Sequence, residues 1–180
     1  MLWFKKQADQ PDKAGRDVIE PGSLGIELDG SIFAAKLDGL INAVHDKGGI
    51  EPFIQALGKK HELFRTALEA GALEELDEAG FEAVLACVFS ARRRLPKVLA
   101  DVGLEQRRQA VGELLYGSEP LVERLAAFQG LGGDNAKLRR AAWDFGAELL
   151  HFNDPEHYPL MARWVWDPNT QSGALREFIR

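Results

Sequence analysis

A glycine-rich turn between two predicted helices, Gly130-Leu131-Gly132-Gly133, is the part of the sequence best suited to hold a ligand. Glycine permits positive φ angles and lets the backbone approach a ligand closely. The first backbone N–H groups of the following helix have no partner within that helix, and they favour an anion such as phosphate. We therefore expect an anion-binding site that is built by Gly130, Gly132, Gly133, Lys137, Arg139 and Arg140.

A second group of chemically capable residues lies between His151 and His157, which flank Asp154 and Glu156. Imidazole and carboxylate groups are common ligands of transition metals. Prolines interrupt this segment, however, and neither histidine has a second one at i+4 on the same helix. The sequence therefore predicts no metal and no cofactor. An enzyme with an unrecognised site around His151, Asp154 and His157 stays open as an alternative.

Helical periodicity extends over most of the chain after residue 29. Asp29 or Ser31 is expected to cap a first helix, with a short hairpin over 26–30 as the alternative. A second helix begins at Glu51-Pro52, pauses at Gly58 and resumes to Gly71. The most apolar helix, over 81–95, is expected to be central and to be broken at Pro96. Further helices are expected over 104–116 and 121–129, from Asp134 through Leu150, and, capped by Thr170, over 172–179.

Residues 81–167 resemble the helix-hairpin-helix DNA glycosylases, the endonuclease-III-like proteins. The resemblance rests on the apolar helix FEAVLACVFSAR, on the hairpin FQGLGGDNA and on the later segment DPEHYPLMARWV. In that superfamily the hairpin contacts DNA, and an aspartate after an aromatic-Pro-apolar segment is catalytic. The helical pattern along the chain predicts an all-α, single compact multi-helix domain, and the resemblance implies that its C-terminal part is helix-hairpin-helix-like.

The same comparison implies that the glycosylase chemistry is missing. When Pro159-Leu160 is matched to the Pro-apolar pair of the superfamily, Met161 stands at the position of the aspartate. Gly133 and Asp134 occupy the region of the lysine nucleophile, and Phe128-Gln129 replaces the usual Leu-Pro. The terminal four-cysteine cluster is also missing. No catalytic residue is predicted.

The bulk composition sets the frame for these expectations. With 180 residues, 46% of them hydrophobic, the chain can form one core, so residues 24–180 are expected to be a single α-helical domain. Residues 1–23 are polar after the first four positions and are expected to form a flexible N-terminal arm. One cysteine, no signal-peptide pattern and no long apolar run favour a cytoplasmic protein without a membrane span.

The distribution of charge and aromatic residues leaves two main functional interpretations. Residues 17–78 contain 13 acidic and 5 basic residues, whereas residues 81–145 contain 8 acidic and 10 basic ones. The basic region favours a non-catalytic module that contacts a nucleic-acid backbone through the glycine turn. The alternative is a protein–protein adaptor that uses acidic N-terminal helices and exposed aromatic residues. Trp164 and Trp166 face different sides of any helix that contains both, so we do not expect both to be fully buried in one core. Core packing is the favoured role of the aromatic cluster, and an exposed tryptophan that binds a partner is the alternative.

Overall fold

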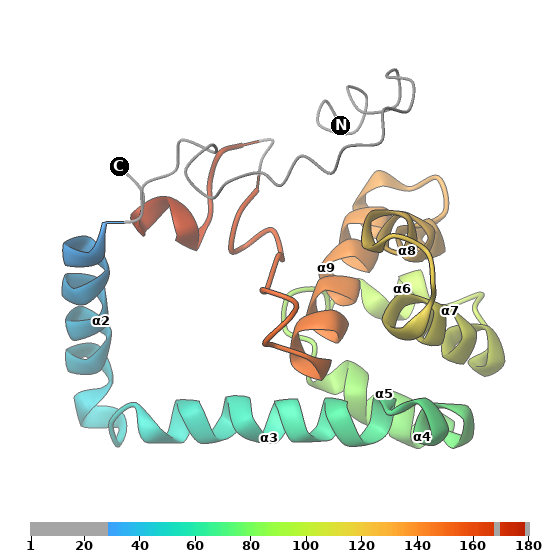
Figure 1. Cartoon of the computed structure of the whole chain (residues 1–180), viewed down its shortest axis with the longest axis horizontal. Coiled ribbons are helices and arrows are strands. Elements are labelled where there is room, and N and C mark those ends of the chain that lie inside the picture. Colours follow the sequence, from blue (N-terminus) through green and yellow to red (C-terminus); the bar gives the residue numbers. More distant parts are fainter. Residues whose placement is uncertain (1–28, 168–169, 179–180) are drawn as a thin grey trace.

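The computed structural model describes residues 29–167 and 170–178, and this part of the chain is all-α (Figure 1). The predicted arm over residues 1–23 lies outside the described residues. Two residues, Asp167 and Ser172, form an isolated antiparallel bridge. The helices, in chain order, are α2 (Gly30–Val44), η2 (His45–Lys47), α3 (Glu51–Leu68), α4 (Ala70–Glu75), α5 (Glu78–Ala86), α6 (Leu95–Val98), α7 (Leu104–Tyr116), α8 (Leu121–Gln129), η3 (Gly130–Gly132), α9 (Ala136–Asn153) and η4 (Ala174–Phe178), where η marks a 3₁₀ helix.

The central helix is α9, which packs against α3, α6, α7 and α8 (Figure 1). Ten of its 18 residues are buried. The ring of Phe145 lies 5.6 Å from that of Phe128 on α8, and the ring of Phe152 lies 5.7 Å from that of Phe64 on α3. The apolar spacing of this helix predicts an inner face of six residues, and the structure confirms it. Leu138 is half-buried, and the other five are buried, namely Ala141, Ala142, Phe145, Leu149 and Leu150.

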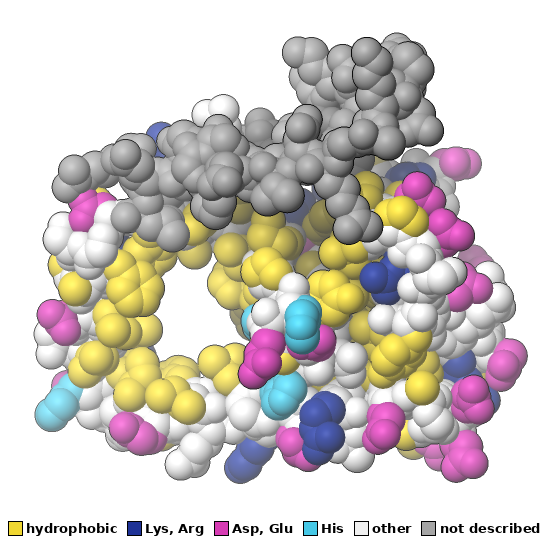
Figure 2. All heavy atoms as spheres, viewed as in Figure 1, with side chains coloured by type: hydrophobic (Ala, Val, Ile, Leu, Met, Phe, Trp, Pro, Cys, Tyr) yellow, Lys and Arg dark blue, Asp and Glu magenta, His cyan; other side chains and the backbone are white. Residues whose placement is uncertain are grey.

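The first two helices form an L-shaped extension of this body (Figure 1). The C-terminal half of α3 joins the core through Phe64 and Leu68, which are fully buried. The N-terminal half of α3 extends away from the core, and α2, which precedes α3 in the chain, lies at a steep angle to it (Figure 1). Val44 is the only buried residue of α2. The side chains of α2 and α3 therefore border an opening through the molecule, which Figure 2 shows to be lined largely by hydrophobic groups.

Several predicted helix boundaries are confirmed. The carboxylate of Asp29 accepts hydrogen bonds from the backbone N–H groups of Ser31 (2.8 Å) and Ile32 (3.2 Å), so Asp29 is the cap of α2. Pro52 lies in the first turn of α3, and α7 ends at Tyr116 as expected. The predicted pause at Gly58 is wrong, because α3 continues through it. A glycine within a helix costs about 1 kcal/mol relative to alanine but leaves the backbone hydrogen bonds intact.

The apolar helix predicted over 81–95 is wrong in length and in position. Its α-helix, α5, ends at Ala86, and α9 takes the central place in the core. Residues 87–94 form turns instead, and Pro96 lies in the first turn of the next helix rather than breaking one. Phe89, expected on the buried stripe, is consequently 73% exposed. A hydrogen bond from the backbone N–H of Ser90 to the side chain of Glu148 stabilises this departure from helical geometry.

Two other predicted helix ends differ, and one predicted helix start has no side-chain cap. Asn135, not Asp134, caps α9, because its side chain accepts hydrogen bonds from the backbone N–H groups of Lys137 and Leu138. Helix α8 begins where expected, but no side chain caps it. The last predicted helix is the 3₁₀ helix η4, and the hydroxyl of Thr170 bonds to that of Ser172 rather than to a helix terminus. None of the helices in the described residues is both long enough and apolar enough to cross a bilayer.

Candidate functional site

The predicted glycine turn forms η3 and connects α8 directly to α9. Gly132 is buried against α9, where a Cβ atom would lie 2.3 Å from the backbone nitrogen of Arg139. No side chain fits at that distance, so Gly132 allows the two backbones to pack. Gly133 has a φ of 55°, in the region that favours glycine. Gly130 has an ordinary helical φ of −59° and open space around it, so it has no such requirement.

The start of α9 retains a smaller set of anion-binding N–H groups than the sequence suggests. The side-chain oxygen of Asn135 accepts from the backbone N–H groups of Lys137 (2.9 Å) and Leu138 (3.3 Å). Those two groups are therefore occupied. The backbone N–H groups of Asp134, Asn135 and Ala136 have no acceptor among the described residues. They leave three donors at the positive end of the helix dipole.

The predicted basic residues around the turn are exposed. Lys137 and Arg140 form no ion pair within residues 29–167 and 170–178, whereas Arg139 donates to the side-chain oxygen of Gln129 at 3.3 Å. The carboxylate of Asp134 is also exposed beside the turn and offsets one positive charge. Of the six predicted residues, Lys137 and Arg140 thus have no ion-pair partner among the described residues at the N-terminal end of α9. The three free N–H groups beside them belong to Asp134, Asn135 and Ala136, which are not among the six.

Two further runs of arginine residues, at 107–108 and at 92–94, have different surroundings. Arg107 donates to the backbone oxygens of Val102 and Leu99, and Arg108 donates to that of Leu76. Both guanidinium groups therefore support the fold. In the run 92–94 all three residues are exposed, and the guanidinium of Arg92 lies 5.0 Å from the centre of the exposed Phe89 ring. That pairing is a cation–π contact on the surface.

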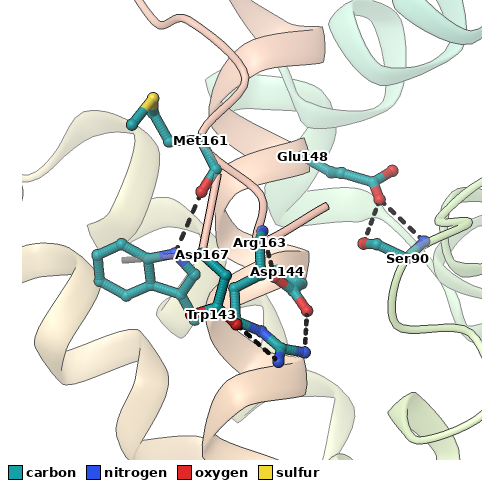
Figure 3. Close-up of polar contacts among 7 residues, drawn as sticks. All are labelled: Ser90, Trp143, Asp144, Glu148, Met161, Arg163 and Asp167. Carbon is teal, nitrogen blue, oxygen red and sulfur yellow. Dashed lines mark hydrogen bonds and ion pairs between the residues drawn. The ribbon is translucent and has the colours of Figure 1, made fainter. Parts of the chain in front are cut away.

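Sequence reasoning missed a pair of buried carboxylates on α9. Asp144 and Glu148 are 3% and 2% exposed and lie one helical turn apart (Figure 3). Glu148 accepts from the backbone N–H of Ser90 at 3.1 Å and from the hydroxyl of the same residue, and it forms an ion pair with Lys60. One carboxylate therefore connects α3, the turns after α5, and α9. The ammonium of Lys60 also lies 3.9 Å from the centre of the Phe152 ring.

Asp144 holds the segment that follows α9. Its two oxygens accept from the backbone N–H (3.1 Å) and from the guanidinium (2.9 Å) of Arg163, which also faces Asp167 at 3.9 Å (Figure 3). A buried charge is tolerated when it is paired and hydrogen-bonded in this way. Because protein cations occupy both carboxylates of α9, their arrangement is structural. The signal in the sequence was the i, i+4 spacing of two acidic residues within an apolar helix.

The region of Met161 borders a small pocket. Met161 is 50% exposed, and its backbone oxygen accepts from the indole N–H of Trp143 at 3.3 Å (Figure 3). The pocket has a volume of about 180 Å³, and His157 is the only ionisable side chain of its lining apart from the phenol of Tyr158. The lining consists of Leu121, Leu125, Trp143, Ala147, Leu150, His157, Tyr158, Pro159 and Met161.

The predicted group around His151, Asp154 and His157 is divided between two contacts. The Nδ1 atom of His151 lies 2.8 Å from the backbone oxygen of Tyr158, and the Nδ1 atom of His157 lies 2.8 Å from the carboxylate of Asp154. Within residues 29–167 and 170–178, no three His, Cys, Asp or Glu side chains are grouped so that they could hold a metal ion. Trp164 is 53% exposed and Trp166 is half-buried, so the two are not both buried in one core, as expected.

The exposed Asp154–His157 pair gives a pH-dependent contact. The hydrogen bond to Asp154 raises the pKa of His157 above its ordinary value of 6.5, and the same bond lowers the pKa of Asp154 below 3.8. The stabilisation from His157 is complete below pH 6.5 and is lost as pH rises through the raised pKa. The stabilisation from Asp154 is complete above pH 3.8 and is lost as pH falls through the lowered pKa. The contact is therefore strongest between these two values.

We expect the imidazole of His157 to titrate above pH 6.5 in a histidine NMR titration, and we expect Asp154→Asn to move its pKa back towards 6.5. Asp134→Asn is the matched control, because Asp134 precedes the start of α9 and does not contribute to the raised pKa of His157. The control should leave the pKa of His157 unchanged. A pKa that stays the same in Asp154→Asn would show that the contact is not formed in solution.

Comparison with known proteins adds no relative to this description. No family model, no curated protein and no solved structure matches the chain.

Proposed function

We propose that this chain is a non-catalytic helical binding module whose α8–η3–α9 hairpin contacts a nucleic-acid backbone. The observation that carries the proposal is made at the N-terminal end of α9. Three backbone N–H groups without acceptors among the described residues lie there, beside the exposed Lys137 and Arg140. Backbone N–H groups and flexible cationic side chains together suit a phosphate group. Contacts of this kind do not distinguish one base sequence of the nucleic acid from another. The turn between α8 and α9 contains one close-packed glycine, Gly132, and one glycine with a positive φ, Gly133. This arrangement also supports a helix-hairpin-helix-like description of the two helices.

The surroundings of the hairpin favour binding over catalysis. Met161, at the position of the glycosylase aspartate, cannot accept a proton or stabilise a cationic sugar. Gly133 and Asp134 provide no amine for nucleophilic attack. The pocket beside Met161 is lined mainly by apolar groups and is smaller than the range of about 300–1,000 Å³ that is typical of small-molecule sites.

The test is a fluorescence-anisotropy titration with duplex DNA over a series of salt concentrations. We expect the double variant Lys137→Glu, Arg140→Glu to weaken binding by about tenfold or more at low salt. We also expect the slope of log K against log salt to fall by about 2, since each lost phosphate contact contributes about 0.9. Binding should not depend on the DNA sequence, because phosphate contacts do not distinguish bases.

The matched control is the double variant Lys47→Glu, Lys59→Glu. Both lysines are exposed, they lie in η2 and α3, and their replacement changes the net charge by the same amount. The proposal requires this control to bind almost as the unchanged chain does, apart from a small long-range effect. Undetectable binding by the unchanged chain, or equal loss in both variants, would contradict it.

A second candidate, protein–protein contact, is favoured by the exposed apolar side chains of α2 and α3. Residues 30–68 contain four acidic and five basic residues. The acidic excess expected for the N-terminal helices therefore does not belong to α2 and α3. It arises from nine acidic residues outside them, four that precede α2 (Asp17, Glu20, Glu27 and Asp29) and five that follow α3 (Glu69, Glu74, Glu75, Asp77 and Glu78). An adaptor function of these two helices would accordingly depend on apolar contact rather than on charge.

A further inference from the structure

A second positively charged surface lies on the turns between α5 and α6. Residues 83–100 contain four basic residues and no acidic one, although the whole chain has a net charge of −6. All four basic side chains are exposed, and none of them forms an ion pair with another described residue. An exposed aromatic ring belongs to the same surface. We call this surface the Phe89 patch, and it consists of Phe89, Arg92, Arg93, Arg94 and Lys97.

The outward position of the Phe89 ring is fixed by its neighbours in the chain. Phe89 is 73% exposed, more than any other large hydrophobic residue in the described part of the chain. Val88 and Ala91 on either side of it are buried, and the backbone N–H of Ser90 donates to Glu148 at 3.1 Å. The segment cannot rotate to bury the ring without breaking these contacts. The ring is therefore held on the surface before any ligand arrives.

The cations of the patch are gathered around this ring and the start of α6. The guanidinium of Arg92 lies 5.0 Å from the centre of the Phe89 ring. The backbone N–H of Lys97 donates to the backbone oxygen of Arg94 at 2.9 Å, so these two residues occupy one helical turn. Like charges at such spacing repel each other, and a bound polyanion relieves that repulsion. The charge of the patch thus favours a partner with several negative charges.

We propose that the Phe89 patch binds single-stranded nucleic acid, with an unpaired base stacked on the ring of Phe89 and the neighbouring phosphates held by the arginine side chains. An aromatic ring beside a row of cations is the combination that binds single strands without sequence preference. Three of the four cations are arginines, which contact phosphate through two parallel hydrogen bonds and also stack on rings. In a duplex the bases are already stacked and paired, so the ring selects unpaired strands.

The composition of the patch favours a nucleic acid over a membrane surface. Binding at a bilayer interface depends on the apolar area that is buried there. Within residues 83–100, Phe89 is the one exposed large hydrophobic side chain, and Leu95 and Val98 are buried. A single ring provides little area for insertion into a bilayer, but it matches a single base.

This contact goes beyond the hairpin function proposed above. The hairpin and the Phe89 patch share no residue. Ser90, which follows Phe89, contacts α9 at Glu148, about three helical turns from the first residue of that helix, Ala136. The patch is proposed for unpaired bases, whereas the hairpin is proposed for the phosphate backbone of a duplex. Each proposal can therefore be tested without the other.

The test is fluorescence anisotropy with a labelled oligothymidylate of about 12 nucleotides, at several salt concentrations from about 50 mM upwards. We expect Phe89→Ala to weaken binding by about tenfold or more and to leave the salt dependence unchanged, because stacking is not a charge contact. The double variant Arg92→Gln, Arg94→Gln should lower the slope of log K against log salt by about 1.4, at about 0.7 for each lost phosphate contact. Far-UV circular dichroism verifies that both variants retain their helices.

Two further variants and a second probe make the test specific for stacking. Phe89→Trp keeps an aromatic ring and should bind at least as tightly as the unchanged chain. Phe53→Ala removes another exposed phenylalanine (48%) on α3 and should have no effect. An oligomer of the same length without bases should bind the unchanged chain about tenfold more weakly, and Phe89→Ala should weaken its binding no further.

Four outcomes would overturn the proposal. They are no binding of oligothymidylate by the unchanged chain, equal binding by Phe89→Ala, equal affinity for the oligomer without bases, and Phe89-dependent binding to phosphatidylserine vesicles in place of the oligonucleotide. Oligothymidylate binding should persist in Lys137→Glu, Arg140→Glu, and duplex binding should persist in Phe89→Ala. Failure at the patch is thereby distinguished from failure at the hairpin.

Discussion

Replacement of Glu148 by alanine is expected to lower the free energy of unfolding by about 3–5 kcal/mol. The substitution leaves the ammonium of Lys60, only 14% exposed, without its counter-charge. It also removes the acceptor for the backbone N–H and the hydroxyl of Ser90. A buried charge that loses its partner keeps its desolvation cost and loses the compensating attraction. Urea unfolding followed by circular dichroism measures the change.

Two further variants separate the buried pair from a general effect of removing a glutamate. Glu62→Ala removes an ion pair with Arg65 in which both side chains are more than half exposed, so it should change the free energy of unfolding little. Glu148→Leu combined with Lys60→Met removes both charges and should cost clearly less than Glu148→Ala. If Glu148→Ala and Glu62→Ala cost the same, the burial of the Lys60–Glu148 pair is not what stabilises this region.

The second large effect is expected for Gly132→Ala, which should destabilise the chain by about 3 kcal/mol. The added Cβ would lie 2.3 Å from the nitrogen and 2.6 Å from the Cα of Arg139, and 2.6 Å from the carbonyl carbon of Leu138. These are backbone atoms, so no side-chain rotation relieves the overlap. The turn must move away from α9, which separates α8 from the central helix. Thermal and urea unfolding both report the loss.

Gly130→Ala, two positions earlier in the same turn, is the matched control. Its φ and ψ of −59° and −23° are helical, and no atom lies within 4 Å of the added Cβ. Alanine there restricts the unfolded chain without strain, so we expect a gain of about 0.4–1 kcal/mol. Equal destabilisation by the two variants would mean that the turn is not packed as described. The two variants also separate close packing from a general need for glycine in this turn.

The sequence by itself determined the fold class and most of the helices. The apolar spacing of α9 identified its inner face, and local chemistry located the starts of α2 and α3 at Asp29 and Pro52. These features depend on residues within one or two turns of each other, so a single stretch contains the information. The glycine turn was identified for the same reason, although the sequence could not show which of its glycines is sterically required.

Only the tertiary structure decided what each helix packs against. Lys60 and Ser90 reach Glu148 from 88 and 58 positions away, and that contact accompanies the early end of α5 and the exposure of Phe89. An apolar stripe indicates that a helix buries one face, but it does not name the partner. In α9 the partner is the rest of the chain, whereas the stripe of α2 remains exposed among the described residues. The physical reason is that burial depends on contacts between distant segments, which local spacing does not encode.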